Sequence, residues 1–359
     1  MKIAIISNGT GGLYGFRKEL ITELLKDNEI VLVSRLSDYR NELIKMGCKL
    51  IAVDMDRRGK NPLSEFSVIK TFYKIVKKEK PDLVITYTIK PNIYGSLACE
   101  LLRTPYAVNI TGLGTAFQKK GALRTLVTMM YKVSLRKAKV VFFENCENQQ
   151  IFIDEKIVPE NKTCLLNGAG VNLDKFPYID YPTDREPVRF LFIGRVMREK
   201  GLNELFKAMR MLRKDGINCS LDVVGGYEEN YESIIRRFEK EGWLNYHGFQ
   251  ADVRPFIANC HCFVLPSWHE GMANTNLECA ASGRPVITSN IHGCLEAVID
   301  GKSGFLCEKQ NARSLYEAMK KLVELPVEDR AEMGKCGRKH MVEVFDKRKV
   351  VAKTISHLL

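Results

Sequence analysis

The chain has 359 residues, of which 45% are hydrophobic and 27% are charged, the balance of a soluble globular protein long enough for two domains. It contains no stretch of about 18 uncharged apolar residues, so we expect no transmembrane helix. The opening MKIAIIS lacks the features of a signal peptide. The net charge is +12, and residues 1–180 contribute +9 of it, which indicates an anionic partner for the N-terminal half: phosphates, a membrane surface or nucleic acid.

The first half of the chain alternates short apolar runs with helical patterns. Runs that are apolar throughout are typical of parallel strands covered by helices on both faces. We expect strands at 2–7, 29–34, 48–54, 81–87, 106–111 and 139–144, and helices at 14–26, 66–78, 93–102 and 122–137.

A second alternation of the same kind follows a glycine-rich and polar segment. We expect strands at 188–194, 220–226, 244–249, 261–267 and 285–289, and helices at 202–214, 231–241, 276–281, 314–325 and 347–359. The fold class is therefore α/β, with two Rossmann-like, doubly wound domains facing a central cleft. The expected boundaries are a first domain at 1–167, a linker at 168–187, a second domain at 188–343 and, at 344–359, a C-terminal helix that returns to the first domain.

Ligands of doubly wound sheets bind beyond the carboxyl ends of the strands, so the loops there are the candidate sites. The loop Gly9-Thr10-Gly11-Gly12 follows the first strand and precedes a helix, an arrangement that favours anions. It does not match the dinucleotide fingerprint GxGxxG, and no acidic residue ends the second strand. A simple tight turn is the alternative interpretation.

Three loops of the second domain are further candidates. GRVMREKG places Arg195 and Lys200 where two cations could bind two phosphate groups, although a solvated basic loop would look the same. Gly226 follows another strand. Phe249 could lie against a nucleobase or belong to the core.

The segment PSWHEGMANTNLECAASGR contains two carboxylates with different explanations. Thr275 and Glu278 fit a capping box, which places Glu278 in the first turn of a helix. Glu270 lies in the preceding loop and has no such role. A phosphate at this helix start would leave Glu270 facing the group attached to the phosphate.

Two patterns could suggest a metal, and we expect neither to hold one. Asp54 and Asp56 form a DxD at the periphery of the first domain, beside two arginines. The run Cys260-His261-Cys262 lies at the start of a strand, where neighbouring side chains point to opposite faces. The first histidine is His247, so the first domain has no catalytic histidine.

Taken together, GR(x)4KG after the first strand of the second domain, Glu270 and Glu278 as E(x)7E, and the segment 282–306 resemble family-4 glycosyltransferases of the GT-B fold. The resemblance covers nearly the whole chain. GGLYGFR (11–17), YTIKPN (87–92) and NITGLGTAF (109–117) are similar to bacterial enzymes that extend undecaprenyl-diphosphate-linked saccharides, including capsule and O-antigen enzymes.

The resemblance implies a role for each matching residue. Arg195 and Lys200 would stabilise the donor diphosphate, and Glu270 would position the sugar, as the catalytic set. Donor contacts would come from Gly11, Gly12, Gly194, Gly226, Phe249, Gly271, Met272, Ala273, Asn274, Thr275, Asn276 and Glu278, of which Glu278 would hold the ribose. Acceptor contacts would come from Tyr14, Arg17, Lys90, Asn92 and Thr111. The resemblance implies no metal and no cofactor, because the UDP-sugar is a co-substrate.

A lipid-linked acceptor would explain the basic segment 119–139 as a helix that binds the membrane surface. Leu123, Leu126, Val127, Met130 and Val133 can share one helix face, flanked by lysines and arginines, as in helices that lie on anionic lipid. Packing on the sheet with a solvated basic side is the alternative.

The sequence therefore predicts a retaining glycosyltransferase that moves a hexose or N-acetylhexosamine from a UDP-sugar to a lipid-linked saccharide. We expect it in the cytoplasm, peripheral on the anionic inner face of the cytoplasmic membrane. One alternative is a UDP-sugar 2-epimerase of the same architecture, which would need the histidine that the first domain lacks. The other is a basic nucleic-acid-binding protein, for which no known motif is present.

Overall fold

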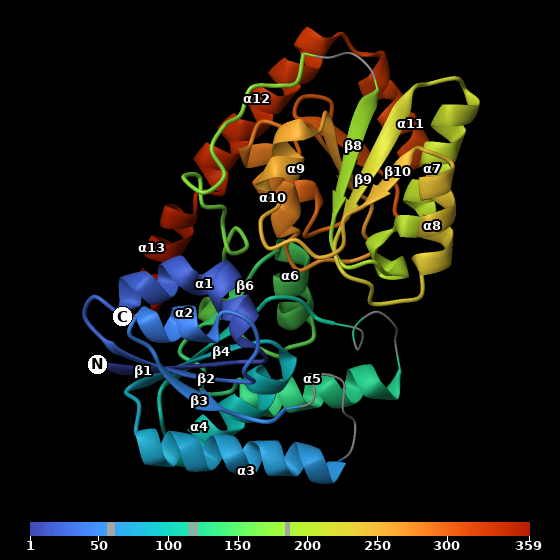
Figure 1. Cartoon of the computed structure of the whole chain (residues 1–359). Helices are drawn as coiled ribbons and strands as arrows, with labels where there is room; N and C mark the ends of the chain where they lie inside the picture. Colours follow the sequence, from blue (N-terminus) through green and yellow to red (C-terminus); the bar gives the residue numbers. More distant parts are fainter. Residues whose placement is uncertain (56–61, 115–116, 118–120, 184–186) are drawn as a thin grey trace. The chain divides into compact units, whose positions relative to one another are not determined.

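The computed structural model describes residues 1–55, 62–114, 117, 121–183 and 187–359. These residues form two compact units (Figure 1). The first comprises Met1–Ala169 and Arg348–Leu359, and the second comprises Gly170–Lys347. The expected linker at 168–187 is therefore not a separate element where it is described, since residues 170–183 group with the second unit.

The first unit is built on a parallel sheet whose order is β3-β2-β1-β4-β5-β6-β7 among the described residues. The strands are β1 Lys2–Ser7, β2 Glu29–Ser34, β3 Lys49–Ala52, β4 Leu83–Tyr87, β5 Tyr106–Ile110, β6 Val141–Phe143 and β7 Thr163–Leu165. Strand β1 pairs in parallel with both β2 and β4. The order therefore reverses between β1 and β4, and ligands of such sheets bind at this kind of reversal.

Helices cover both faces of the first sheet (Figure 1). They are α1 Thr10–Leu24, α2 Arg40–Lys45, α3 Pro62–Glu79, α4 Ser96–Leu102, α5 Ala122–Ser134, α6 Cys146–Asp154 and α13 Lys347–Leu358, with a π-helix at Pro91–Gly95 that runs into α4. One core contains side chains of α3, α4 and α5, and the other contains those of α1 and α2. Val350 and Leu358 of α13 join the second core beside Ile3, which fixes the C-terminal helix in this unit.

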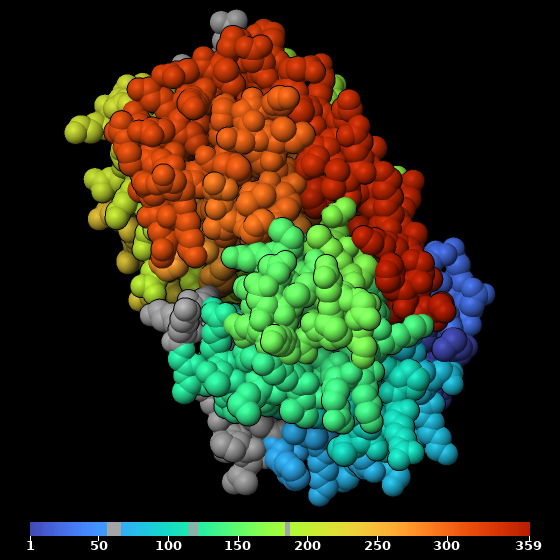
Figure 2. Space-filling model, turned by 180° about the vertical axis from the view of Figure 1, so that it is seen from behind, coloured from blue at the N-terminus to red at the C-terminus, as the bar shows by residue number. Residues whose placement is uncertain are grey.

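The second unit repeats the architecture with the sheet order β10-β9-β8-β11-β12-β13 among the described residues. The strands are β8 Val188–Ile193, β9 Cys219–Val224, β10 Leu244–Tyr246, β11 Cys262–Leu265, β12 Val286–Ser289 and β13 Gly304–Cys307. The helices are α7 Leu202–Lys214, α8 Glu232–Lys240, α9 Arg254–Asn259, α10 Asn274–Ala281, α11 Ala312–Glu324 and α12 Val327–Val344. Here the order reverses between β8 and β11. In Figure 2 the orange and red segments form much of this unit's surface.

A buried arginine holds the start of the second unit in place. The Arg284 guanidinium is fully buried and donates to the carbonyl oxygens of Ile179 and Asp180, each at 3.0 Å, and to that of Ile257 at 2.8 Å. These bonds satisfy a buried cation with backbone acceptors alone. Residues 179 and 180, expected in a linker, are thereby part of the packed domain.

Several expected elements differ from the structure. Helix α1 begins at Thr10 instead of Tyr14, so Gly11 and Gly12 lie in its first turn and not in a loop. Strands β7 and β13 and helices α2, α6, α9 and α12 had no counterpart in the prediction. Helix α12 contains two glycines in its interior, and Gly334 packs so tightly that a Cβ would overlap the backbone oxygen of Gly283.

None of the helices in the described parts of the chain combines the length and the apolar character that crossing a bilayer would require.

Candidate active site

The strongest constellation lies at the carboxyl ends of β8 and β11, the strands that flank the reversal in the second sheet. Lys200, from the loop after β8, forms an ion pair with Glu270, from the loop after β11. The Ser267 hydroxyl donates to the same carboxylate oxygen of Glu270, Oε1, at 2.8 Å. The structure thus brings together two of the three residues predicted to be catalytic, and it adds Ser267 as a second donor to Glu270.

Two glycines allow the loop that carries Glu270 to lie so close to its neighbours. Gly201 has φ +76°, and a Cβ on it would overlap the backbone oxygen of Pro266. Gly293 has φ +88°, and a Cβ on it would overlap the backbone oxygens of Glu270 and Gly271. Both glycines combine a left-handed backbone with close contact, so no other residue fits without displacement. The sequence interpretation assigned neither of them a role.

A backbone hydrogen bond and a contact between His269 and Glu199 also join the two loops. The amide of Trp268 donates to the Glu199 oxygen at 2.9 Å. The ring of His269 lies 3.5 Å from the Glu199 carboxylate. Burial lowers the pKa of His269, while the carboxylates of Glu199 and Glu270 raise it. His269 therefore belongs to the candidate site, and its position next to Glu270 was the signal that could have found it.

Helix α10 begins directly after this loop, but not through the predicted capping box. Its first residue is Asn274, its N-cap is Ala273, and no side chain caps it. The amide of Ala273 instead donates to the Gly293 oxygen at 2.7 Å, which anchors the entry into the helix. Thr275 is consequently inside the helix. The predicted capping box is wrong.

The beginning of α10 contains buried polar atoms that are available to a ligand. Asn276 is fully buried, and its Nδ2 donates to Thr288 Oγ1 at 3.1 Å. The side-chain oxygens of Asn274 and Asn276 are buried and accept no hydrogen bond within the described part of the chain. Since buried polar atoms in proteins are nearly always paired, we expect these oxygens to accept hydrogen bonds from a donor such as ordered water.

Glu278 lies one turn further along α10 and not in its first turn, which corrects the sequence interpretation. Its side chain is half-buried. Burial raises the pKa of Glu278 to about 7, although the positive charges of Lys175 and Lys347 lower it. Glu278 therefore changes its protonation state near neutral pH.

The other predicted donor residues of this unit lie outside the Lys200–Glu270 pair. Arg195 is 3.5 Å from Glu228 and is not paired with Glu270. Gly194 lies against Gly225, whose Cβ would overlap the Gly194 oxygen. Phe249 is 73% exposed, so the alternative that placed it in the core is wrong. Gly226 is open, with no atom near a hypothetical Cβ. Met272 is buried in the core cluster of the unit.

The corresponding end of the first sheet holds a different arrangement. Arg17, from α1, forms a buried ion pair with Glu144, which follows β6, and its guanidinium lies 4.8 Å from the ring centroid of Tyr87 at the end of β4. The neighbouring carboxylate raises the pKa of Arg17 against the effect of burial. The sequence interpretation missed Glu144, because 127 residues separate it from Arg17.

The remaining predicted acceptor residues lie in the same unit, on α1 and on the segments that follow the adjacent strands β4 and β5. The Tyr14 ring stacks on Tyr39 with centroids 4.6 Å apart. Asn92 is buried in the π-helix, and its Nδ2 donates to the Asn109 oxygen at 2.9 Å, so it holds the backbone instead of facing solvent. Lys90 and Thr111 are half-buried. Gly11, which was predicted to contact the donor, donates its amide to Ser37 Oγ at 3.2 Å.

Neither metal-like pattern of the sequence forms a ligand cluster where it is described. Asp54 is exposed, and Asp56 lies outside the described residues. His261 is buried and accepts a hydrogen bond from the Arg189 amide at 3.0 Å. The thiols of Cys260 and Cys262 donate to backbone oxygens, and burial raises the pKa of both.

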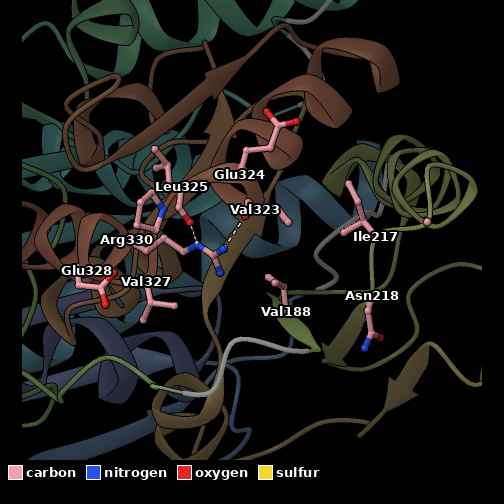
Figure 3. A pocket seen from close by; sticks show the side chains of 11 residues that line it. Val188, Ile217, Asn218, Val323, Glu324, Leu325, Val327, Glu328 and Arg330 are labelled. Carbon is pink, nitrogen blue, oxygen red and sulfur yellow. Dashed lines mark hydrogen bonds between the residues drawn. The ribbon is translucent and has the colours of Figure 1, made fainter.

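One cavity lies at the opposite end of the second sheet, away from the candidate site. Its volume is 520 Å³, and Figure 3 shows Val188 at the amino end of β8, the turn after α7 and the junction of α11 with α12 around it. Arg330 donates to the oxygens of Leu325 and Val323, as drawn. Because ligands of such sheets bind at the carboxyl ends of the strands, we give this cavity no role in the candidate reaction.

Comparison with known proteins assigns both halves of the chain. Residues 180–340 match the family of glycosyl transferases group 1, and residues 2–145 match the glycosyl transferase 4-like family. The chain is 30% identical to N,N'-diacetylbacillosaminyl-diphospho-undecaprenol alpha-1,3-N-acetylgalactosaminyltransferase of Campylobacter jejuni, with 90% of each chain covered. It is 29% identical to UDP-Gal:alpha-D-GlcNAc-diphosphoundecaprenol alpha-1,3-galactosyltransferase of Escherichia coli, over 73% of this chain and 71% of the relative.

A solved structure supports the fold over the whole length. The HepE protein of Anabaena, in complex with UDP and glucose, superposes with a TM-score of 0.81 over 100% of both chains at 16% identity. The architecture is therefore GT-B, as the sequence predicted. The chain belongs to the glycosyl transferases of group 1 and is a glycosyltransferase.

Proposed function

We propose that this enzyme transfers a hexose or N-acetylhexosamine from a UDP-sugar to an undecaprenyl-diphosphate-linked saccharide, with retention of the anomeric configuration. The observation that carries the proposal is the Lys200–Glu270 pair at the reversal of the second sheet, beside the start of α10. The names of the relatives in Campylobacter jejuni and Escherichia coli support the lipid-linked acceptor. No observation favours the epimerase or the nucleic-acid-binding alternative.

In the proposed reaction, the bond between the anomeric carbon and the diphosphate oxygen breaks while the acceptor oxygen bonds to the same face of that carbon. The acceptor proton passes to the leaving diphosphate oxygen. Negative charge grows on the diphosphate during this step, and the cations of Lys200 and Arg195 would stabilise it, together with the helix start at Asn274. No metal is required in this scheme.

The carboxylate of Glu270 would leave Lys200 for the sugar hydroxyls when the donor binds. Its partners Lys200 and Ser267 keep it in place until then. Glu278 would accept hydrogen bonds from the ribose, and its pKa of about 7 makes donor affinity sensitive to pH in that range. A membrane-borne acceptor would place the enzyme on the anionic inner face of the cytoplasmic membrane.

The decisive experiment incubates the purified full chain with a panel of UDP-sugars and short-chain polyprenyl-diphosphate saccharides that stay in solution. We expect a product with one additional sugar, with the anomeric configuration of the donor retained by NMR. An inverted product would disprove retention, and no transfer or UDP binding with any donor would reject the proposal. Loss of transfer on treatment with EDTA would contradict the metal-free scheme.

A further inference from the structure

Helix α5 presents apolar side chains on two opposite faces. Val127, Met130 and Tyr131 pack on the core of the first unit. On the outer face, Leu126 and Val133 are 56% and 59% exposed. The sequence interpretation grouped Val127 and Met130 with the outer residues, which is wrong. The outward face of a surface helix is ordinarily polar, so packing within this unit does not explain the exposed apolar residues.

The exposed residues form one surface, which we call the α5 stripe. It consists of Leu101, Leu123, Leu126, Met129 and Val133, all more than half exposed. Spacings of three and four residues place Leu126, Met129 and Val133 along one line of the helix, with Leu123 at its margin. Leu101 belongs to the C-terminal end of α4, and Glu100 beside it accepts a hydrogen bond from the Lys137 amide at 3.1 Å. The two helix ends therefore adjoin.

The margins of the stripe are positively charged. Lys132, Arg136 and Lys137 are exposed on or just after α5, and no acidic residue occurs between Leu101 and Phe143. The carboxylates that contact α5 and the residues just after it are paired: Glu100 with Arg136, and Glu155 with Arg124. An apolar stripe with cationic margins matches the interface of an anionic bilayer, where apolar side chains enter and lysines and arginines contact the phosphates.

A second copy of the chain fits this surface less well. In a twofold dimer the same patch meets itself, so the cationic margins of the two copies would face each other. We infer that the α5 stripe docks the enzyme on an anionic lipid bilayer. The inference rests on the proposed function, because a lipid-linked acceptor is embedded in such a bilayer.

The test measures binding of the full chain to lipid vesicles by co-sedimentation, without donor or acceptor. We expect binding to vesicles of phosphatidylglycerol and phosphatidylethanolamine, weakened by salt, and little binding to phosphatidylcholine alone. The double variant Leu126→Ser/Met129→Ser removes two apolar side chains and should lower the partition coefficient at least about tenfold. Lys132→Gln/Arg136→Gln should lower it about tenfold on anionic vesicles only.

Control variants carry changes of the same kind elsewhere. Ile44→Ser alters an exposed apolar residue of α2, on the other face of the first sheet, and Lys207→Gln/Arg210→Gln alters two exposed cations of α7. These should bind vesicles as the wild type does. Equal losses in the controls, or no preference of the wild type for anionic vesicles, would overturn the inference. So would a dimer in light scattering that Leu126→Ser/Met129→Ser converts to monomer.

The two proposals can fail separately. Transfer to a short-chain acceptor in solution tests the chemistry without a membrane, whereas vesicle binding tests the stripe without substrates. The stripe variants should retain transfer to the soluble acceptor and lose it only when the acceptor is embedded in anionic vesicles.

Discussion

The two units place a cation–carboxylate pair at the same end of similar sheets, but at different depths. In the first unit, the side chains of Arg17 and Glu144 are 9% and 5% exposed, and Tyr87 covers the guanidinium. In the second unit, those of Lys200 and Glu270 are 17% and 12% exposed and belong to loops. A deeply buried pair exchanges partners at a high cost, because separation leaves an uncompensated charge, and this cost is lower for a pair with more access to water. We therefore expect a structural role for the first pair, whereas the proposed chemistry rests on the second.

This difference changes the role of Arg17. The resemblance to other glycosyltransferases made it a candidate contact for the acceptor. Its burial and its pairing with Glu144 indicate instead that it joins α1 to the end of β6. We therefore regard Arg17 as a positioning residue, and the predictions below test that distinction.

The largest expected effect is the loss of stability in Arg17→Ala. Removing the guanidinium leaves Glu144 buried without its counter-ion, which should lower the free energy of unfolding by about 3–5 kcal/mol. The double variant Arg17→Met/Glu144→Leu should recover most of that loss, because it removes both charges. Urea denaturation measures both. If the double variant folds well but its KM for a soluble acceptor rises more than tenfold, Arg17 contacts the acceptor after all.

The second effect is on turnover with the fold intact. Glu270→Ala and Lys200→Ala should each lower kcat about 10²–10³-fold. Lys200→Ala removes the cation that would stabilise the charge on the leaving diphosphate, and Glu270→Ala removes the carboxylate that would hold the sugar. Their urea midpoints should stay close to that of the wild type, because both side chains are partly solvated. Glu270→Gln keeps the size of the side chain and removes its charge, so its kcat shows how much of the loss is due to the charge. If Glu270→Ala and Lys200→Ala both kept kcat within a few-fold of the wild type, the proposed catalytic role of the second pair would be rejected.

The fold was largely predictable because buried parallel strands are apolar throughout and give a strong local signal. The core strands of both sheets, such as β1, β2 and β8, occur where the sequence placed them. Helix α12 was not predicted, because the glycines at 334 and 337, which pack against neighbouring elements, interrupt the apolar pattern. The start of α1 was misplaced for a similar reason, since glycine-rich segments favour loops when read locally.

The candidate site was predictable only where topology brings loops together. Lys200 and Glu270 follow adjacent strands, so their approach could be inferred from the order of a doubly wound sheet. The Arg17–Glu144 pair and the support from Gly293 depend on contacts between distant segments, which leave no local pattern. The capping box failed because the tertiary bond from Ala273 to Gly293 sets the start of α10 in place of a side-chain cap.

A third effect tests how closely the loops of the second pair must approach. Gly201 and Gly216 have similar φ values of +76° and +79°, but only at Gly201 would a Cβ meet another atom, the Pro266 oxygen. Gly201→Ala should therefore cost about 2 kcal/mol more stability than Gly216→Ala, and it should lower turnover by displacing Lys200. Because the two φ values are similar, the strain of placing alanine in a left-handed backbone is nearly the same in both variants and cancels in the difference. Equal losses in the two variants would show that contact with Pro266 is unimportant.

The smallest effect concerns Glu278, a carboxyl group that no described ion pair neutralises. In the folded protein its pKa is about 7, raised from 4.5 by burial. Between these values the folded state binds more protons than the unfolded state, so this group lowers stability as pH rises. Glu278→Gln cannot ionise. Its free energy of unfolding relative to the wild type should therefore rise between pH 4.5 and 7 and then level off. We expect a rise of only about 1 kcal/mol, because water reaches part of the side chain.

Urea denaturation across this pH range, with Glu317→Gln as a control on an exposed carboxyl of α11, measures the difference. The same variant should flatten the pH dependence of UDP affinity near neutrality if the Glu278 carboxylate holds the ribose. A constant difference in stability across the range would mean that folding does not raise the pKa of Glu278. Glu278 would then be solvated in the folded protein, and a carboxylate of the second unit would be as accessible as the comparison of the two units requires.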